Sequence, residues 1–190
     1  MKKLFLIIAL FILQSSVCLA EENLTCDGIL GFKFRDNYSQ VMEMSRTNHF
    51  DNIGIYKEPS RVLHVVSKGT AADKKAKLYF ELFDDQLFRI TICFFVPSEN
   101  VNSEFYSLKN DLSTKYGKPR CEEKYFAIWG VETTTGDRAF IFLSTSCNRL
   151  SFLYSNAALS EEAEKYIEAE KENKNGTIEP ELIFISPEIK

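Results

Sequence analysis

Residues 77–95 read KLYFELFDDQLFRITICFF, and this stretch predicts the centre of the fold. Apolar and polar residues alternate on both sides of Asp84-Asp85, as in two half-buried strands joined by a two-residue turn. Side chains alternate along a strand, so each strand has one apolar face. These faces carry Leu78, Phe80 and Leu82 on the first strand and Phe88, Ile90, Ile92 and Phe94 on the second. The stretch therefore predicts an antiparallel hairpin packed on a core.

Three helices are expected around this hairpin. Residues 35–48 predict the first, with Asn37 as N-cap and Gln40 as its capping-box partner. The second lies within residues 97–119, where Gly117 and Pro119 end a helically spaced apolar stripe. That stripe consists of Phe105, Leu108, Leu112 and Tyr116. The third is the charged run at 160–174, with Ser160 as its expected cap.

Strands are also expected at 28–34, 52–59, 61–68 and 150–154. The order of strands and helices predicts an α+β fold with an antiparallel sheet and packed helices. Two helix-then-hairpin units follow each other and suggest a degenerate internal repeat. We assign 1–20 to a signal peptide, 21–156 to the α+β domain, and 157–190 to a C-terminal helix and apolar tail.

Residues 121–147, CEEKYFAIWGVETTTGDRAFIFLSTSC, predict a second hairpin bracketed by two cysteines. With the turn centred on Thr134, Trp129 faces Ala139, and Cys121 faces Cys147 at the open end. Opposed Cα atoms about 4.5–5.5 Å apart suit a disulfide. We therefore expect Cys121–Cys147 and, by elimination, Cys26–Cys93. The chain has no Cys-x-x-Cys motif, which argues against a zinc or redox site for these cysteines.

This second hairpin is apolar on both faces. In the expected register Tyr125, Ala127, Trp129, Ile141 and Leu143 form one face, and Phe126, Ile128, Phe140 and Phe142 form the other. A half-exposed sheet should alternate apolar with polar residues, so we expect both faces to be covered. Helices can cover one face. The C-terminal tail, a second copy or a partner protein can cover the other, and the tail segment 181–185 is the favoured cover.

The first 20 residues have the layout of a secretory signal peptide. Lys2 and Lys3 precede an apolar run of about ten residues, and Ala20 follows as a cleavage site. The run is too short to span a bilayer, which needs about 20 apolar residues. Lipid attachment at Cys18 is disfavoured because the preceding residues lack the usual leucine. We expect a periplasmic or secreted protein with no transmembrane segment after cleavage.

Composition limits the partners of the mature chain. Removing Lys2 and Lys3 from 23 basic residues leaves 21 against 27 acidic ones, a formal net charge of −6. No basic cluster stands out, so nucleic acid is a poor partner. The four cysteines that remain after cleavage favour disulfides in an exported chain.

Motifs for catalysis or metal binding are not evident in the sequence. His49 and His64 have no paired ligand spacing, so we expect two ordinary histidines and no metal site. Asp84-Asp85 fits turn chemistry better than calcium binding or acid–base work. No Gly-x-Ser-x-Gly elbow occurs. We therefore expect a non-enzyme without a cofactor.

The motifs GFKFRDNYSQV (31–41), LYFELFDDQLFRITICFF (78–95) and LKNDLSTKYGKP (108–119), followed by a Trp-bearing strand, resemble those of small exported bacterial α+β domains. These include the β-lactamase-inhibitor-protein-like fold and the SmpA/OmlA-type lipoproteins. The resemblance covers residues 28–156 and implies protein binding rather than catalysis. It assigns no functional residue. The chain departs from the lipoproteins by lacking a lipid-attachment cysteine.

The sequence thus favours a non-catalytic module that binds another envelope protein, as an inhibitor or an assembly factor. A small-molecule or lipid carrier is the alternative, because 16 Phe and 8 Tyr could line an apolar pocket. A deep apolar cavity would favour the carrier, and a flat exposed face the binding module.

Overall fold

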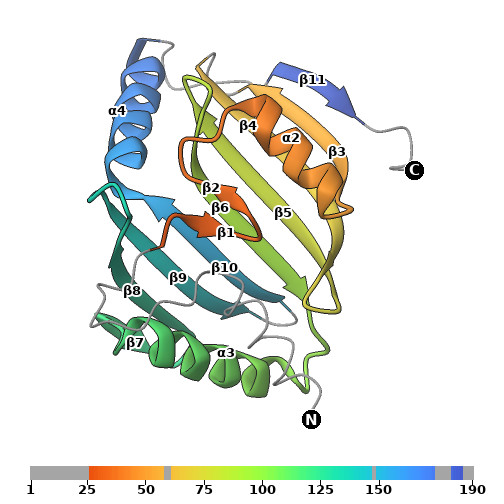
Figure 1. The fold of residues 1–190 in the computed structure, drawn as a ribbon, viewed down its shortest axis with the longest axis vertical. Helices are drawn as coiled ribbons and strands as arrows, with labels where there is room; N and C mark the ends of the chain where they lie inside the picture. The colour runs from red at the N-terminus through yellow and green to blue at the C-terminus, as the bar shows by residue number, and fades with distance from the viewer. Residues whose placement is uncertain (1–25, 58–60, 147–148, 174–180, 186–190) are drawn as a thin grey trace.

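The structure is a computed structural model that describes residues 26–57, 61–146, 149–173 and 181–185. It confirms the expected class, because helices pack on a large antiparallel sheet in an α+β fold (Figure 1). The expected signal peptide, residues 1–20, lies outside the described residues, as does Cys147.

The large sheet has nine strands in the order β11-β3-β4-β5-β6-β10-β9-β8-β7. All of its neighbouring strands are antiparallel. Its strands are β3 (Asp51–Lys57), β4 (Val62–Ala71), β5 (Lys74–Phe83), β6 (Gln86–Phe95), β7 (Cys121–Glu123), β8 (Phe126–Glu132), β9 (Arg138–Ser146), β10 (Arg149–Asn156) and β11 (Glu181–Ile185). A separate pair, β1 (Gly28–Ile29) and β2 (Phe32–Lys33), precedes them.

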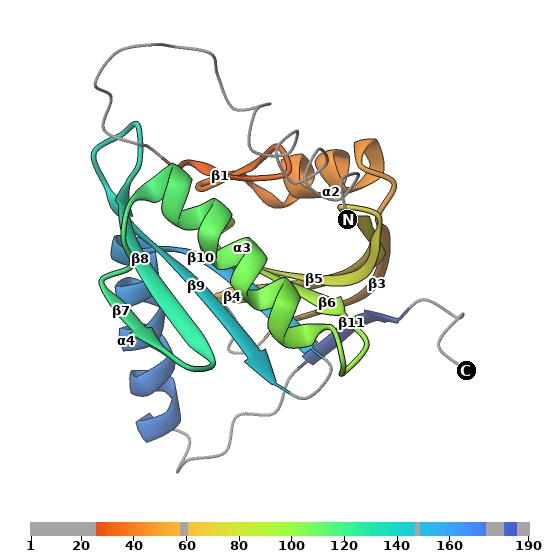
Figure 2. The same cartoon turned by 90° about the horizontal axis from the view of Figure 1, so that it is seen from below.

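Two successive units, each a helix followed by four antiparallel strands, build most of this sheet. The first is α2 (Tyr38–Thr47) with β3 to β6, and the second is α3 (Val101–Tyr116) with β7 to β10. β6 pairs with β10, so the two units meet in the middle and run outward in mirrored strand order. Both helices lie on the same side of the sheet (Figure 2). The succession of two helix-plus-strand units agrees with the sequence expectation.

Asp84 and Asp85 form the turn between β5 and β6, as expected. Their φ angles are 47° and 60°, which a two-residue type I′ turn requires. A register shift next to the turn pairs Leu82 with Leu87. Leu87 therefore joins the main core, whereas Phe88 packs in a second cluster with the C-terminal helix. The expected face was wrong at Phe88 because this irregularity moves it to the other side.

The first two helices begin and end as the sequence predicts. The Asn37 side chain accepts the backbone N–H of Gln40 at 3.0 Å, and the Gln40 side chain accepts that of Asn37 at 2.8 Å. This is the expected capping box of α2. In α3, Phe105 and Leu112 are buried, and Gly117 ends the helix with a φ of 76°.

The C-terminal helix α4 (Ala157–Asn173) starts three residues before the expected cap. The Asn156 side chain accepts the backbone N–H of Leu159 at 3.1 Å and takes the capping role. Ser160 lies inside the helix, where its hydroxyl bonds that of Ser155. The assignment of Ser160 as cap was therefore wrong, because β10 leads directly into α4.

The second hairpin forms with a different register and a different first strand. Trp129 pairs with Ile141 rather than with Ala139, a shift of two residues that keeps each side chain on its expected face. Cys121 does not continue β8. A turn at residues 124–125 reverses the chain, and Cys121 in β7 pairs with Ile128. Tyr125 lies in that turn and is 51% exposed, so its assignment to a buried face was wrong.

The main core lies between the sheet and the layer formed by α2, α3 and the β1–β2 pair. Trp129 is fully buried there, and its indole N–H donates to the Gly117 carbonyl at 3.0 Å. Phe32 from β2 packs on Phe80 with ring centroids 4.5 Å apart. Burial of these large rings is the main source of stability for this layer.

Candidate binding surface

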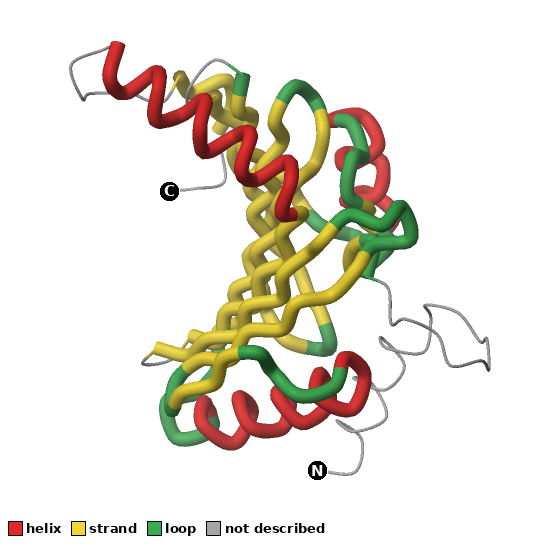
Figure 3. The backbone as a smooth tube through the Cα atoms, turned by 90° about the vertical axis from the view of Figure 1, so that its left-hand side faces the viewer, coloured by secondary structure: helices red, strands yellow, loops and turns green. Residues whose placement is uncertain are grey.

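The two faces of the large sheet are covered unequally. In the described part of the chain, α2, α3 and the β1–β2 pair lie on one face, and α4 alone lies on the other (Figure 3). We call the second side the open face. Its central residues are Val66, Tyr79, Thr91, Ile128, Phe140, Phe142 and Leu153.

A continuous row of side chains crosses the open face from β4 to β8. Each residue of this row pairs with the next on the neighbouring strand: Val66 with Tyr79, Tyr79 with Thr91, Thr91 with Leu153, Leu153 with Phe142 and Phe142 with Ile128. Five of the six are apolar or aromatic, and none is fully buried. We call these six residues the central row. The row is therefore a contiguous, mainly apolar and partly exposed surface, and apolar surface of this kind is typical of interaction sites.

The two faces of the same strands differ sharply in exposure. Trp129 and Ile141 on the core face are fully buried, whereas Phe140, next to Ile141 in the chain, is 39% exposed. Phe95 at the end of β6 is 44% exposed. The hairpin is thus apolar on both faces, as expected, but the expectation that both are covered was wrong for the described residues.

The described segment of the C-terminal tail, residues 181–185, does not cover the second hairpin. Its strand β11 pairs with β3 at the far edge of the sheet, seven strands away from β8. Backbone pairing at that edge extends the sheet and leaves the face of β8 and β9 open. The favoured cover by residues 181–185 is therefore wrong.

α4 covers one end of the open face. Leu159 and Ala163 pack on Val62, Phe83 and Phe88 near the β5–β6 turn. Arg89 on β6 lies 2.9 Å from Glu164 of α4 and 3.2 Å from Glu81 of β5. These contacts hold the helix to the end of the sheet beyond the central row.

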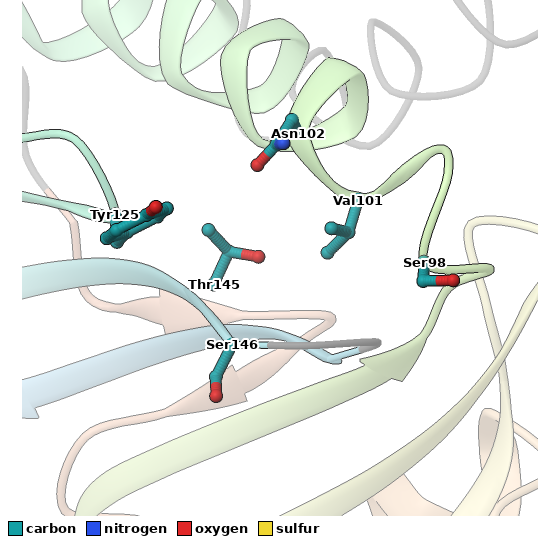
Figure 4. Close-up of a pocket in the computed structure, with 6 residues that line it drawn as sticks. All are labelled: Ser98, Val101, Asn102, Tyr125, Thr145 and Ser146. Atoms are coloured by element: carbon teal, nitrogen blue, oxygen red, sulfur yellow. The ribbon is translucent and has the colours of Figure 1, made fainter.

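Two cavities lie outside the open face, and neither is an enclosed apolar pocket. The first, of about 410 Å³, opens between the first turn of α3 and the ends of β8 and β9 (Figure 4). Its lining includes Ser98, Asn102, Thr145 and Ser146, with Tyr125 at one side. The second, of about 230 Å³, lies among Asp27, Arg35, Asp137 and Asn156. The walls of both cavities mix polar and apolar groups, whereas a carrier of apolar ligands encloses them in a mainly apolar pocket.

Cys26 and Cys93 lie on opposite faces of the sheet. Cys26 is buried on the core side, with its thiol 3.7 Å from the Gly28 carbonyl. Burial raises the pKa of Cys26, and a hydrogen bond with Tyr116 opposes that rise. Cys93 lies on the open face, 3.6 Å from the Ser151 hydroxyl. Both are free thiols, and the expected Cys26–Cys93 pairing is not formed because the sheet separates them.

Cys121 is exposed on β7 and is bonded to no other described cysteine. The geometric argument for Cys121–Cys147 required Cys121 to continue the hairpin strand. The structure instead places it on a third strand, with β8 between it and β9. Cys147 lies outside the described residues, so the bond itself stays a prediction.

The two histidines lie apart from each other, one on a strand and one in a turn. The His64 ring stacks on Tyr56 with centroids 4.7 Å apart, and His49 lies in the turn after α2 with a φ of 58°. Among the described residues, no cluster of three or more His, Cys, Asp or Glu side chains could hold a metal ion. In the same part of the chain, no helix is long and apolar enough to cross a membrane.

Sequence reasoning named the apolar residues of the second hairpin but missed the rest of the central row. Tyr79 and Leu153 come from strands about 70 residues apart in the chain, and only the pairing of β6 with β10 joins their halves of the sheet. The alternation within residues 77–95 places Tyr79 and Thr91 opposite the core. This alternation can be read from the sequence, but the order of the strands in the sheet cannot.

Comparisons with known proteins add no family assignment. No protein-family model matches the chain, and neither the curated proteins nor the solved structures include a significant match. The resemblance to small exported bacterial domains therefore stays a prediction.

Proposed function

We propose that the protein is a non-catalytic binding module of the bacterial periplasm or exterior, and that another envelope protein binds its open face. The observation that carries this proposal is the central row, a line of half-buried and mainly apolar side chains on a part of the antiparallel sheet that no described element covers. An isolated apolar face of this kind gains free energy when a partner removes it from water.

The shape of the surface favours a macromolecular partner over a small ligand. The exposed rings of Phe95 and Phe140 lie on an open sheet, whereas these two cavities are open to solvent and have mixed polar and apolar walls. A carrier would enclose its ligand in an apolar pocket and bury most of the ligand's surface. An open sheet face with aromatic side chains instead suits a protein interface.

The proposal is tested by affinity purification from the native host. The bait is the exported protein with a cleavable tag, and co-purifying proteins are quantified by mass spectrometry. We expect a stoichiometric envelope protein with the wild-type bait and at least a tenfold loss with the double variant Phe140→Ser, Phe142→Ser.

A matched control is Tyr106→Ser, which removes an aromatic ring that is 46% exposed on α3, on the other side of the sheet. This variant should keep the partner. Circular dichroism should show both variants folded. Equal loss in both variants, or a wild-type bait that brings down no stoichiometric protein, would contradict the proposal.

A further inference from the structure

The two ends of the open face carry opposite charge. α4 stands at one end and contains six Glu and two Lys. At the other end, beyond the central row, lie Lys75 and Lys77 on β5 and Arg149 on β10. We call these three residues the basic end.

The charges of the basic end have no acidic partner within the described residues. Lys77 pairs across the sheet with Cys93, and Arg149 pairs with Phe95, an exposed ring on the same face. None of the three cations forms an ion pair there. Three such cations around an exposed ring are complementary to a partner surface that carries carboxylates.

α4 supplies carboxylates of that kind. Glu162, Glu168 and Glu172 are exposed and form no ion pair with a described residue. The helix projects from the open face, away from the side that carries α2 and α3 (Figure 2). Its outer surface can therefore reach a second molecule that approaches this face.

The open face is complementary to a second copy of itself. A twofold axis that lies in the face, across the strands, reverses the direction of the strands in the second copy. Each α4 then meets the basic end of the other copy, and the two central rows meet in the middle. A twofold interface of this type makes every charge contact twice.

We propose that a second copy of this chain occupies the open face, with α4 of each protomer against Lys75, Lys77 and Arg149 of the other. This inference rests on the proposed function, because it assigns the same face. The dimer hides the central row, so the envelope partner and the second copy compete for it.

A charge-swap experiment on the purified mature protein tests this geometry. The first variant is Lys75→Glu, Lys77→Glu, Arg149→Glu, and the second is Glu162→Lys, Glu168→Lys, Glu172→Lys. Sedimentation velocity over a range of concentrations gives the dimer dissociation constant. We expect the dimer dissociation constant of each variant alone to rise at least about tenfold, because like charges then face each other.

Mixing the two variants should restore a heterodimer with near wild-type affinity, because both contacts regain opposite charges. A merely unfolded variant cannot give this rescue. The control Lys33→Glu, Arg46→Glu, Lys118→Glu reverses three exposed cations away from the open face and should dimerise like wild type. A wild-type monomer at all concentrations, or a dimer that the variants leave unchanged, would overturn the proposal.

The two proposals fail separately. If the chain is monomeric but its open face captures an envelope protein, the dimer is wrong and the proposed function stands. If the charge-swap rescue succeeds but no envelope protein is captured through Phe140 and Phe142, the dimer stands and the proposed function is wrong.

Discussion

Arg35 and Asp137, 102 residues apart in the chain, form an ion pair with 2.9 Å between Nη2 and Oδ2. Arg35 follows β2 with a φ of 71°, and Asp137 precedes β9. The same carboxylate accepts the side-chain amide of Asn156 at 3.3 Å. Asp27 adds a parallel link, since its carboxylate accepts both the backbone N–H and the hydroxyl of Thr134 at 2.7 Å. These bonds attach the N-terminal strand pair to the second unit.

Asp137 should make stability depend on pH. The hydrogen bonds from Arg35 and Asn156 hold the pKa of Asp137 below its ordinary value of 3.8. A lowered pKa in the folded state adds stability above about pH 4. This added stability is lost as the pH falls through the pKa that Asp137 has in the folded state. We expect Asp137→Asn to lower the free energy of unfolding at pH 7 by about 1 kcal/mol, and by less at pH 3.

Urea unfolding at the two pH values measures this difference. The matched control is Asp73→Asn, in an exposed turn with a φ of 59°, which asparagine tolerates. An equal effect of both substitutions at pH 7 would argue against the Arg35–Asp137 contact.

Asp85 joins the central hairpin to the first helix. Its carboxylate accepts the backbone N–H of Tyr38 at 2.8 Å, at the start of α2, and its φ is 60°. Asp85→Ala removes this acceptor and places alanine in the left-handed region, so we expect the melting temperature to fall by about 2–8 °C for a loss of about 1–2 kcal/mol. Asp85→Asn keeps an acceptor and tolerates the conformation. It should melt within about 2 °C of wild type by calorimetry.

Trp129 should be one of the most costly side chains to remove. It is fully buried and its N–H has a partner, so Trp129→Ala should cost about 3–5 kcal/mol of unfolding free energy. Phe95→Ala removes a ring that is 44% exposed on the same sheet and should cost about 1 kcal/mol or less. Denaturant unfolding followed by far-UV circular dichroism compares the two. Similar costs would mean that the core is not where the structure places it.

The described thiols should react at very different rates after mild reduction. Cys121 is exposed, Cys93 is partly covered, and Cys26 is buried with a raised pKa. Because the thiolate is the reactive form, iodoacetamide at pH 8 should label Cys121 first and Cys26 only on unfolding. Timed labelling with peptide mass spectrometry gives the order. Rapid labelling of Cys26 in the folded protein would contradict its placement.

Peptide mapping without reduction tests the remaining disulfide prediction. A Cys121–Cys147 peptide would confirm that pair, although the observed register does not supply the geometry on which it was based. A free Cys121 would show that the cysteine count alone misled the assignment.

Local signals were sufficient for the elements of the fold. The Asp84-Asp85 turn, the Asn37–Gln40 capping box and the helix end at Gly117 all depend on residues within one turn of each other. Such preferences act within a few residues and can therefore be read from the chain. The error at Phe88 arose because a register shift beside the turn moved this residue to the other face of the sheet. The error at Ser160 arose because β10 leads directly into α4, so the helix begins earlier.

The candidate site was predictable only in part. Phe140, Phe142 and Ile128 were recognised as a second apolar face, because a strict alternation of period two survives a two-residue change of register. Its cover was not recognised, since that depends on where β11 docks. The basic end also escaped notice, because Lys75 and Arg149 come close only through the pairing of β5, β6 and β10.

The sequence by itself determined the α+β class, the two helix-plus-strand units and, apart from Phe88 and Tyr125, the faces of the two hairpins, because turn residues, caps and alternation are local. The tertiary structure decided which strands are neighbours, that Cys26 and Cys93 lie apart, and which face the described elements leave open. Those outcomes depend on contacts between segments tens of residues apart. The energies of many alternative pairings are similar, and only the packing of the whole sheet selects one of them.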